Sequence, residues 1–559
     1  QKYPNLKEIR RFDWDSAEAE VKILKDLMSG EWLCHPQLFG IATNLLYVSG
    51  GLMKMKELMK QTGKYTQNNF NILPYVKNRN YLPQQLCHFS PYQEDHRHRN
   101  ILDAGKLQKG VVRRTSPYKT ISLKEGERKL AEVFESVRNN LDTKIHVICA
   151  PTSLGKTRII TQQENAIVGF PDHALKDEVS NIMKVDHAST PNLMDYLDEE
   201  DRKYVEHCHK VGAHRRAAGY IYKKKSMPEA YSTKPGEQAY REYQQKLTTA
   251  LNSEGTILTT HTKLQSIDNE DRTVYFDEDP FTSAFLTMHD AYISDIKYIM
   301  LGVKDTSDRG ILSIILDNAS HAPQNTLVEM PEFAFNDYRE IENLAVRNRN
   351  MLGNILDFLN CKHFLIDNRD MNKLHFLKQN LPIEGRKVVI FSATANEWIY
   401  RQLFGERVEF HYVDQVELQG KLVQDTTFSF SRKNVHSKPE VIKYALEKVE
   451  DRMVITFQEF AKYFKNAYTD IYFGNCQGKD KYQDKPLAII GTPHVSPAVY
   501  YLYSKYLGLE FKPEDFRQDM YRVHRNGLFF NFYTFEDERL RTLQFYFIER
   551  ELKQAIGRG

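Results

Sequence analysis

The stretch KIHVICAPTSLGKT, residues 144–157, decides the fold. Its first part, Lys144–Cys149, alternates apolar residues and predicts a buried strand. The loop Ala150–Thr157 then meets most of the pattern G-x-x-x-x-G-K-S/T, in which backbone N–H groups and a helix N-terminus point at phosphates. Ala150 and Ser153 stand where glycines are common. The stretch therefore predicts a strand, a phosphate-binding loop and a helix.

The side chains of this loop suit a nucleotide. Lys156 can reach the β- and γ-phosphates of ATP, and the Thr157 hydroxyl can bind Mg²⁺. An ordinary turn between a strand and a helix is the alternative interpretation. The predicted ATP-binding positions are Thr152, Ser153, Gly155, Lys156 and Thr157.

A second strand ends in consecutive carboxylates, in RTVYFDEDPF at residues 272–281. Asp277 would hold Mg²⁺ through water, and Glu278 would polarise the attacking water. Acidic residues after an apolar strand are also common in solvated loops. Because the carboxyl ends of parallel strands converge on one crevice, a phosphate loop upstream favours the catalytic interpretation.

These segments resemble those of superfamily 2 helicases and translocases. Further matches follow in the family's order, and together the series runs from Ala150 to Gly559. The additional matching segments are IVGFPDHALKDEV (167–179), ILTTHTKL (257–264), VVIFSAT (388–394), MVITF (453–457), GNCQGKD (474–480) and QAIGRG (554–559).

The long connection from Asp277 to Ser392 makes the chain resemble the XPD/DinG-like group, which carries a helical insertion at this point. Two departures from that group are visible. The acidic segment reads DEDP rather than DEAH, and the group's four-cysteine iron–sulfur pattern is missing between Thr157 and Asp277. The insertion is expected to be helical because ENLAVRNRNMLGNILDFL has apolar residues at spacings of three and four.

The resemblance also assigns roles that the residues alone do not. It implies that Gln554 contacts nucleotide or a neighbouring segment, and that Arg558 reaches the γ-phosphate across a cleft. It places Gly478 and Asp480 at the nucleotide. The nucleic-acid contacts that it implies are Pro171, His173, Thr260, His261, Thr492 and His494.

The predicted architecture is an α/β fold with two RecA-like parallel-sheet lobes, helical insertions and an N-terminal accessory domain. We expect the accessory domain over residues 1–120. The first lobe is expected over 121–400, with insertions near 180–255 and 281–381, and the second over 401–559. SLKEGERKLAEVFESVRNN (122–140) predicts an amphipathic helix that leads into the first lobe.

The N-terminal region gathers potential zinc ligands in CHFSPYQEDHRHRN, residues 87–100. Cys87, His96 and His98 are the residues that would bind Zn²⁺, and the layout faintly resembles the cysteine-histidine clusters of primase-associated proteins. The spacing is not that of a known zinc finger. A polar surface loop is the alternative.

Composition excludes several classes. The chain has 559 residues and six scattered cysteines, which do not form a disulfide framework and suit a reducing cytoplasm. We find no signal peptide and no apolar run of membrane-spanning length. With 77 basic and 74 acidic residues the net charge says little, so nucleic-acid binding must come from local features such as HRRAAGYIYKKK (214–225), which could equally be a solvated face.

Two functions remain open. The first is an ATP-dependent helicase or translocase that moves on nucleic acid, with single-stranded or tailed DNA as the expected partner and ATP and Mg²⁺ as cofactors. The second is a DNA-stimulated ATPase that acts in recruitment or signalling within a replication or antiphage-defence assembly, with protein partners. A structural protein with an inactive site is disfavoured, because Lys156, Asp277, Glu278 and Arg558 are all present.

Overall fold

The structure is a computed structural model that describes most of the chain in two compact units. One unit combines residues 1–118 with 517–536, and the other combines 119–516 with 537–559. We had expected segment 517–536 within the second lobe. The described residues are 9, 12–64, 71–79, 81–105, 112–114, 120–225, 235–267, 272–323, 326–367, 370–381, 385–417, 420, 422–425, 427–468, 470–476, 485–525 and 527–557.

The first unit is a helical bundle with a small antiparallel sheet. Its core includes Leu24, Ile41 and Met55, and the Asp13 side chain caps the first helix by accepting from Ser16 N–H. The helices are α1 (Trp14–Glu20), α2 (Lys22–Met28), α3 (His35–Leu45), α4 (Gly51–Gln61), α6 (Ile72–Arg79), α7 (Ile101–Gly105) and the short η1 (Leu86–His88) and η2 (Gln93–Arg97). The sheet has the order β1 (Val112–Arg114), β16 (Leu528–Phe535) and β15 (Gln518–Arg525).

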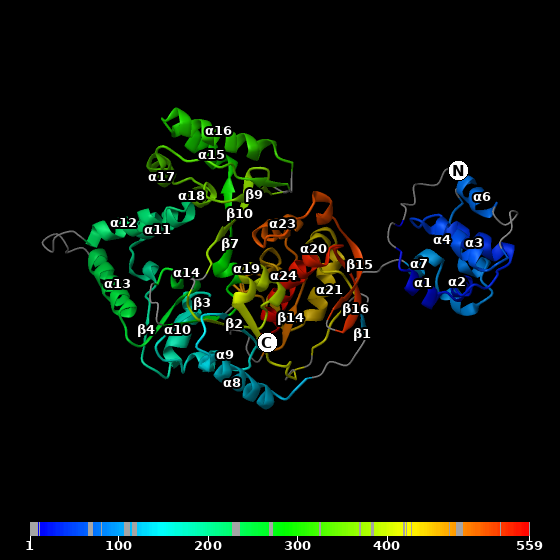
Figure 1. Cartoon of the computed structure of the whole chain (residues 1–559), viewed down its shortest axis with the longest axis horizontal. Coiled ribbons are helices and arrows are strands. Elements are labelled where there is room, and N and C mark those ends of the chain that lie inside the picture. Colours follow the sequence, from blue (N-terminus) through cyan, green and yellow to red (C-terminus); the bar gives the residue numbers. More distant parts are fainter. Residues whose placement is uncertain are drawn as a thin grey trace. The chain divides into compact units, whose positions relative to one another are not determined.

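The second unit is built on a seven-stranded sheet in which every neighbouring pair is parallel (Figure 1). This confirms the predicted α/β fold. In spatial order the strands are β12 (Val408–Tyr412), β2 (Ile145–Cys149), β11 (Val388–Ser392), β6 (Thr273–Asp277), β3 (Ala166–Phe170), β5 (Thr256–Thr260) and β4 (His187–Ser189).

Strand β11 lies between β2 and β6, and this order positions the chemistry. Cys149 pairs with Ser392, and Phe391 pairs with Asp277, so the three strands end at the same edge. Five helices follow or flank these strands, and all but α9 begin at a side-chain cap, as where Asp172 accepts from Leu175 N–H. These helices are α8 (Leu123–Asn139), α9 (Lys156–Ile160), α10 (His173–Ile182), α14 (His261–Leu264) and α19 (Glu397–Phe404).

The two insertions share one hydrophobic core, which the sequence did not indicate. Val205 and Tyr240 from the first insertion belong to the same buried cluster as Ile296 and Phe364 from the second. The first contributes η3 (Leu193–Tyr196), α11 (Glu199–Val211), α12 (His214–Lys225) and α13 (Pro235–Leu251). The second contributes the π-helical turn η5 (Phe281–Phe285), β7 (Leu286–Tyr292), α15 (Ile293–Gly302), α16 (Thr306–His321), β8 (Leu327–Glu329), α17 (Tyr338–Arg347), α18 (Ile355–Phe358), β9 (His363–Ile366) and β10 (Lys373–Gln379).

The second insertion is therefore not purely helical. Its four strands form an antiparallel sheet in the order β7-β10-β9-β8, and helices α15–α18 gather at the far end of β7 (Figure 1). KLHFLKQ in β10 largely alternates buried and more exposed residues, which is the pattern of a strand. ENLAVRNRNMLGNILDFL, which we expect to be helical, contributes to two helices, because α17 ends at Arg347 and α18 begins at Ile355.

The remaining part of the second unit forms a smaller lobe. Its parallel pair, β13 (Met453–Ile455) and β14 (Leu487–Ile489), packs with Val441, Phe457 and Ala555. The helices are α20 (Arg432–Ser437), α21 (Pro439–Val449), α22 (Gln458–Ala461), η7 (Pro513–Phe516), α23 (Pro497–Tyr506) and α24 (Glu538–Ile556). Among the described helices, none has the length and apolar character that crossing a membrane requires.

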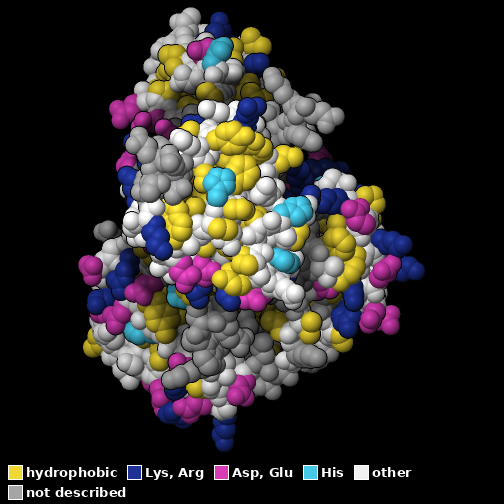
Figure 2. Space-filling view, turned by 90° about the vertical axis from the view of Figure 1, so that its right-hand side faces the viewer, with side chains coloured by type: hydrophobic (Ala, Val, Ile, Leu, Met, Phe, Trp, Pro, Cys, Tyr) yellow, Lys and Arg dark blue, Asp and Glu magenta, His cyan; other side chains and the backbone are white. Residues whose placement is uncertain are grey.

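Charged side chains do not segregate by sign on the face drawn in Figure 2. Lysine, arginine, aspartate and glutamate are interspersed around a central area rich in hydrophobic side chains. This distribution agrees with the near-balanced count of 77 basic and 74 acidic residues. Net charge alone therefore identifies no partner.

Candidate active site

The phosphate loop turns sharply at the end of β2. Ser153 and Gly155 adopt left-handed backbone conformations, with φ of 62° and 83°. A Cβ added at Gly155 would lie 3.6 Å from its nearest neighbour, so a side chain would fit without a clash. Glycine is favoured here because of the positive φ angle. The Ala150 N–H donates to Ser392 O at 3.0 Å, which ties the start of the loop to the end of β11.

Lys156 is folded back over this loop. Its side chain is buried, and Nζ donates to Pro151 O at 2.8 Å and to Ala150 O at 3.2 Å. The ammonium group is thereby held against the carbonyl groups of the turn. The loop N–H groups and Lys156 belong to the same eight-residue segment, Ala150–Thr157. A phosphate bound by these N–H groups would therefore lie close to the Lys156 ammonium group.

The acidic loop after β6 is strained and partly enclosed. Asp277 is the last residue of β6 and is only 3% exposed. The next residue, Glu278, has φ of 68°, a conformation that is uncommon for residues other than glycine and is concentrated at functional sites. Gln554 Nε2 donates to Glu278 Oε2 at 2.7 Å, so a helix from the second lobe orients this carboxylate.

Asp279 anchors the acidic loop, and sequence reasoning missed its role. Its carboxylate is 1% exposed and accepts from Tyr400 OH at 2.6 Å, from Tyr546 OH at 2.9 Å and from Phe281 N–H at 3.0 Å. Burial raises the pKa of both tyrosines well above the usual value, and the neighbouring Asp279 raises it further. Both hydroxyls therefore remain protonated donors.

Arg550 completes this buried network. Its guanidinium donates to the Thr282 hydroxyl. Burial lowers the pKa of Arg550, but the neighbouring Tyr546 and Asp279 more than offset this and raise it above the usual value. A cation thus lies beside the buried Asp279 carboxylate, as a buried charge requires.

Helix α24 brings these contacts together along one face. Tyr546, Arg550 and Gln554 are spaced by four residues, so they lie in one row and meet the acidic loop in turn. At the end of α24, a Cβ added to Gly557 would lie 3.0 Å from Thr152 of the phosphate loop. Helix α24 therefore touches the loops that follow both β2 and β6.

The segment after β11 forms the third part of the site. Ser392 is fully buried, and its hydroxyl accepts from Thr394 N–H at 2.9 Å and Ala395 N–H at 2.8 Å. Lys553 Nζ donates to Ala393 O at 3.4 Å. Helix α24 consequently contacts all three strand ends that the sequence singled out.

His261, expected at the nucleic acid, is enclosed in the protein. Its ring is 1% exposed, and Nε2 lies 3.0 Å from Asp277 O while Nδ1 lies 2.8 Å from Ser283 Oγ. Burial lowers the pKa of His261 to about 3, so the ring is neutral. In this structure His261 supports the acidic loop, and the preceding Thr260 caps α14 by accepting from Lys263 N–H.

The other expected nucleic-acid residues lie on two segments. Pro171 and His173 stand at the start of α10, half-buried, and burial lowers the pKa of His173. Thr492 and His494 follow β14, where His494 N–H donates to Thr492 O at 2.8 Å. Gly478, Asp480 and Arg558 lie outside the described residues.

The donor set fits Mg²⁺ at the sheet edge but not zinc in the first unit. Thr157 on α9 and Asp277 on β6 offer the hard oxygen ligands that Mg²⁺ prefers. Each of the three proposed zinc ligands has a different neighbour. Cys87 Sγ lies 3.7 Å from Gln85 Oε1. His96 Nε2 lies 3.1 Å from Ser90 O, and His98 Nε2 lies 3.4 Å from Glu20 Oε2. In the described part of the chain they do not form a group of converging ligands.

Tyr546→Phe is expected to destabilise the protein by about 1–3 kcal/mol, since it removes a donor from a buried carboxylate. Urea unfolding followed by tryptophan fluorescence measures the change. Tyr298→Phe is the matched control, because Tyr298 is 42% exposed on α15. Equal stability of the two variants would show that the Tyr546 hydroxyl does not stabilise Asp279.

Comparison with solved structures gives distant similarities. The chain is similar to an XPD helicase with a TM-score of 0.45 and 13% identity, covering 78% of this chain and 92% of that one. It is also similar to an apo form of XPD, with a TM-score of 0.41 and 11% identity, covering 78% of this chain and 92% of that one. A truncated XPD gives a TM-score of 0.30 and 14% identity, covering 51% of this chain and 98% of that one. No protein-family profile and no curated protein matches the chain.

The fold and the site define an α/β protein in which the loop Ala150–Thr157 after β2, the acidic loop after β6 and helix α24 meet at one edge of a parallel sheet. The identities to the XPD structures, 13% and 11%, are too low to transfer the role of any residue. Roles are therefore assigned below from this chain's own geometry.

Proposed function

We propose that the chain is an ATP-dependent helicase or translocase that couples hydrolysis between two lobes to movement on nucleic acid. The observation that supports this most is the position of α24. Gln554 donates to Glu278 at 2.7 Å, and Gly557 lies beside Thr152. A helix of the smaller lobe thus reaches both the acidic loop and the phosphate loop of the larger lobe.

The proposed chemistry divides among the residues at this edge. The loop N–H groups and Lys156 bind the β- and γ-phosphates, and Thr157 with Asp277 would hold Mg²⁺, which neutralises phosphate charge when bound. Glu278 accepts a proton from the attacking water. Gln554 keeps the Glu278 carboxylate in place, so hydrolysis depends on the position of α24.

The same contacts supply a route from hydrolysis to movement. Bound ATP would contact Lys156 on the larger lobe and α24 on the smaller lobe, so it favours the closed arrangement of the two lobes. Loss of the γ-phosphate removes this preference for the closed arrangement. We propose that the strand is gripped by the segments carrying Pro171 and His173 on one lobe and Thr492 and His494 on the other. Single-stranded or tailed DNA in the cytoplasm is the proposed partner.

An assay of the whole protein tests this function. We expect Mg²⁺-dependent ATP hydrolysis that rises when single-stranded DNA is added, and unwinding of a fluorescent duplex carrying a single-stranded tail. Hydrolysis with no movement would instead favour the recruitment ATPase. Absence of ATP hydrolysis with both DNA and RNA strands would end the proposal.

A further inference from the structure

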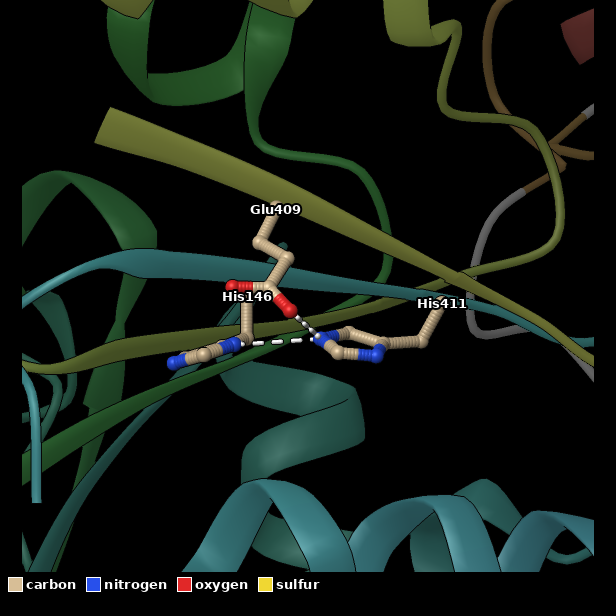
Figure 3. A group of neighbouring side chains, drawn as sticks. All are labelled: His146, Glu409 and His411. Atoms are coloured by element: carbon tan, nitrogen blue, oxygen red, sulfur yellow. Dashed lines mark hydrogen bonds and ion pairs between the residues drawn. The ribbon is translucent and has the colours of Figure 1, made fainter. Parts of the chain in front are cut away.

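A cluster of potential metal ligands lies on the edge of the large sheet, apart from the strand ends already described. His146 is in β2, and Glu409 and His411 are in the neighbouring edge strand β12 (Figure 3). Glu409 is paired with His146 in the parallel register, and His411 is two residues further on, so all three project from one face. Their nearest ligand atoms all lie within 4.8 Å of one another.

The His146 ring is held in one tautomer. Its Nε2 lies 2.9 Å from Asp142 Oδ1. An ionised carboxylate only accepts, and the proton of a neutral His146 therefore lies on Nε2. This leaves the Nδ1 lone pair directed at His411.

We infer that His146 Nδ1, His411 Nε2 and a Glu409 carboxylate oxygen bind a divalent transition-metal ion of the zinc type. The two ring nitrogens are 3.1 Å apart. Two imidazoles on a tetrahedral zinc, each with a Zn–N distance of about 2.0–2.1 Å, place their nitrogens about 3.3 Å apart. Only a small adjustment is needed for both nitrogens to bind one ion.

Glu409 can supply the third ligand atom. Its Oε1 lies 4.0 Å from His411 Nε2, while Oε2 is 3.3 Å from Lys144 Nζ. The ion pair with Lys144 therefore leaves the other oxygen facing the histidines. A rotation of this exposed side chain would bring Oε1 into bonding distance.

Burial and support also fit a metal site. The side chain of His146 is 1% exposed, that of His411 is 21% exposed and that of Glu409 is 43% exposed, so the cluster opens on one side to solvent. Solvent access gives an entry path and a fourth position for water. Asp142 behind His146 is the carboxylate partner that orients a metal-binding histidine.

Without an ion the two rings share one hydrogen bond, in which His411 Nε2–H donates to His146 Nδ1. Binding the ion requires His411 to carry its proton on Nδ1 instead, and no proton is lost from the neutral pair. Both rings bind a metal ion in their neutral form.

The ion would cross-link strands β2 and β12 through its ligands. β12 is at the edge of the sheet, with β2 as its neighbour, and the chain passes from β12 toward the second lobe. The same β2 ends in the phosphate loop. A bound ion would therefore fasten the connection between the lobes to the strand that carries the nucleotide site, without touching the nucleotide.

The test is metal binding by the whole protein after removal of metals with a chelator. We expect one equivalent of Co²⁺ to give the visible absorption of a tetrahedral site and to be displaced by Zn²⁺. His411→Ala and Glu409→Gln should abolish this absorption, and Asp142→Asn should weaken binding by about 10–100-fold. Glu409→Gln changes an exposed side chain, so it tests the site even if His411→Ala fails to fold.

His96→Ala is the matched control because it removes a histidine of the N-terminal cluster. This variant should bind Co²⁺ like the unaltered protein. The inference is overturned if the unaltered protein gives no tetrahedral Co²⁺ spectrum, if Glu409→Gln and the unaltered protein bind equally, or if His96→Ala removes the signal. None of these measurements depends on ATP hydrolysis, so they are independent of the proposed function.

Discussion

Arg558→Ala is expected to lower nucleic-acid-stimulated ATP hydrolysis by about 10³–10⁵-fold, the range measured for arginines that reach a transferred phosphoryl group. Gly557 lies beside Thr152 of the phosphate loop, and Arg558 is the next residue. We propose that the Arg558 guanidinium stabilises the charge that develops on the γ-phosphoryl group. Affinity for ATP should change little, because this charge develops only in the transition state.

Steady-state phosphate release and binding of a fluorescent ATP analogue measure the two quantities. Arg558→Lys should recover little activity, since an ammonium group cannot reproduce the planar fork of a guanidinium. Arg401→Ala is the control: Arg401 is exposed on α19 and pairs with Glu397 at 2.8 Å. Turnover of Arg558→Ala equal to that of this control would show that α24 does not complete the active site.

Glu278→Gln is expected to lower turnover by about 10²–10⁴-fold while ATP still binds, because an amide cannot take a proton from water. The substitution keeps the shape of the side chain, and the new amide oxygen can still accept from Gln554. Asp277 and Lys156 are unchanged, so the phosphate and Mg²⁺ contacts remain. The substitution should therefore slow the hydrolysis step and leave ATP binding unchanged.

Pre-steady-state hydrolysis in a single turnover separates this step from product release. Glu406→Gln provides the control, because Glu406 is exposed in the short helix η6 (Gly405–Arg407). If Glu278→Gln reduced nucleotide affinity as much as turnover, Glu278 would be a binding group. If it changed neither, the acidic loop would have no catalytic part.

Much of the site could be predicted because its main-chain elements are encoded locally. The apolar runs before Ala150, Glu278 and Ala393 form β2, β6 and β11, as their patterns indicate. Such patterns depend on residues two positions apart, and a single sequence shows them directly. The second insertion was harder, because the helical spacing on which its prediction rested covers only part of it.

Asp279, Tyr400, Tyr546 and Arg550 were not found because their roles come from contacts between distant segments. Tyr546 and Asp279 are separated by 267 positions in the chain, and Tyr400 and Asp279 by 121. Nothing in the spacing of a tyrosine reveals that its hydroxyl meets a buried carboxylate. A row of Tyr, Arg and Gln at intervals of four on α24 was the only available signal.

The sequence by itself determined strands β2, β6 and β11, the turns at their ends and the order of the loops after β2 and β6, because backbone preference and side-chain periodicity act over a few residues. Tertiary structure decided that β11 lies between β2 and β6, that two insertions share one core, that segment 517–536 belongs to the first unit and that His261 is enclosed. It also brought His146 to Glu409 and His411. These outcomes depend on which apolar surfaces bury one another, a property of the whole packed chain that no local pattern contains.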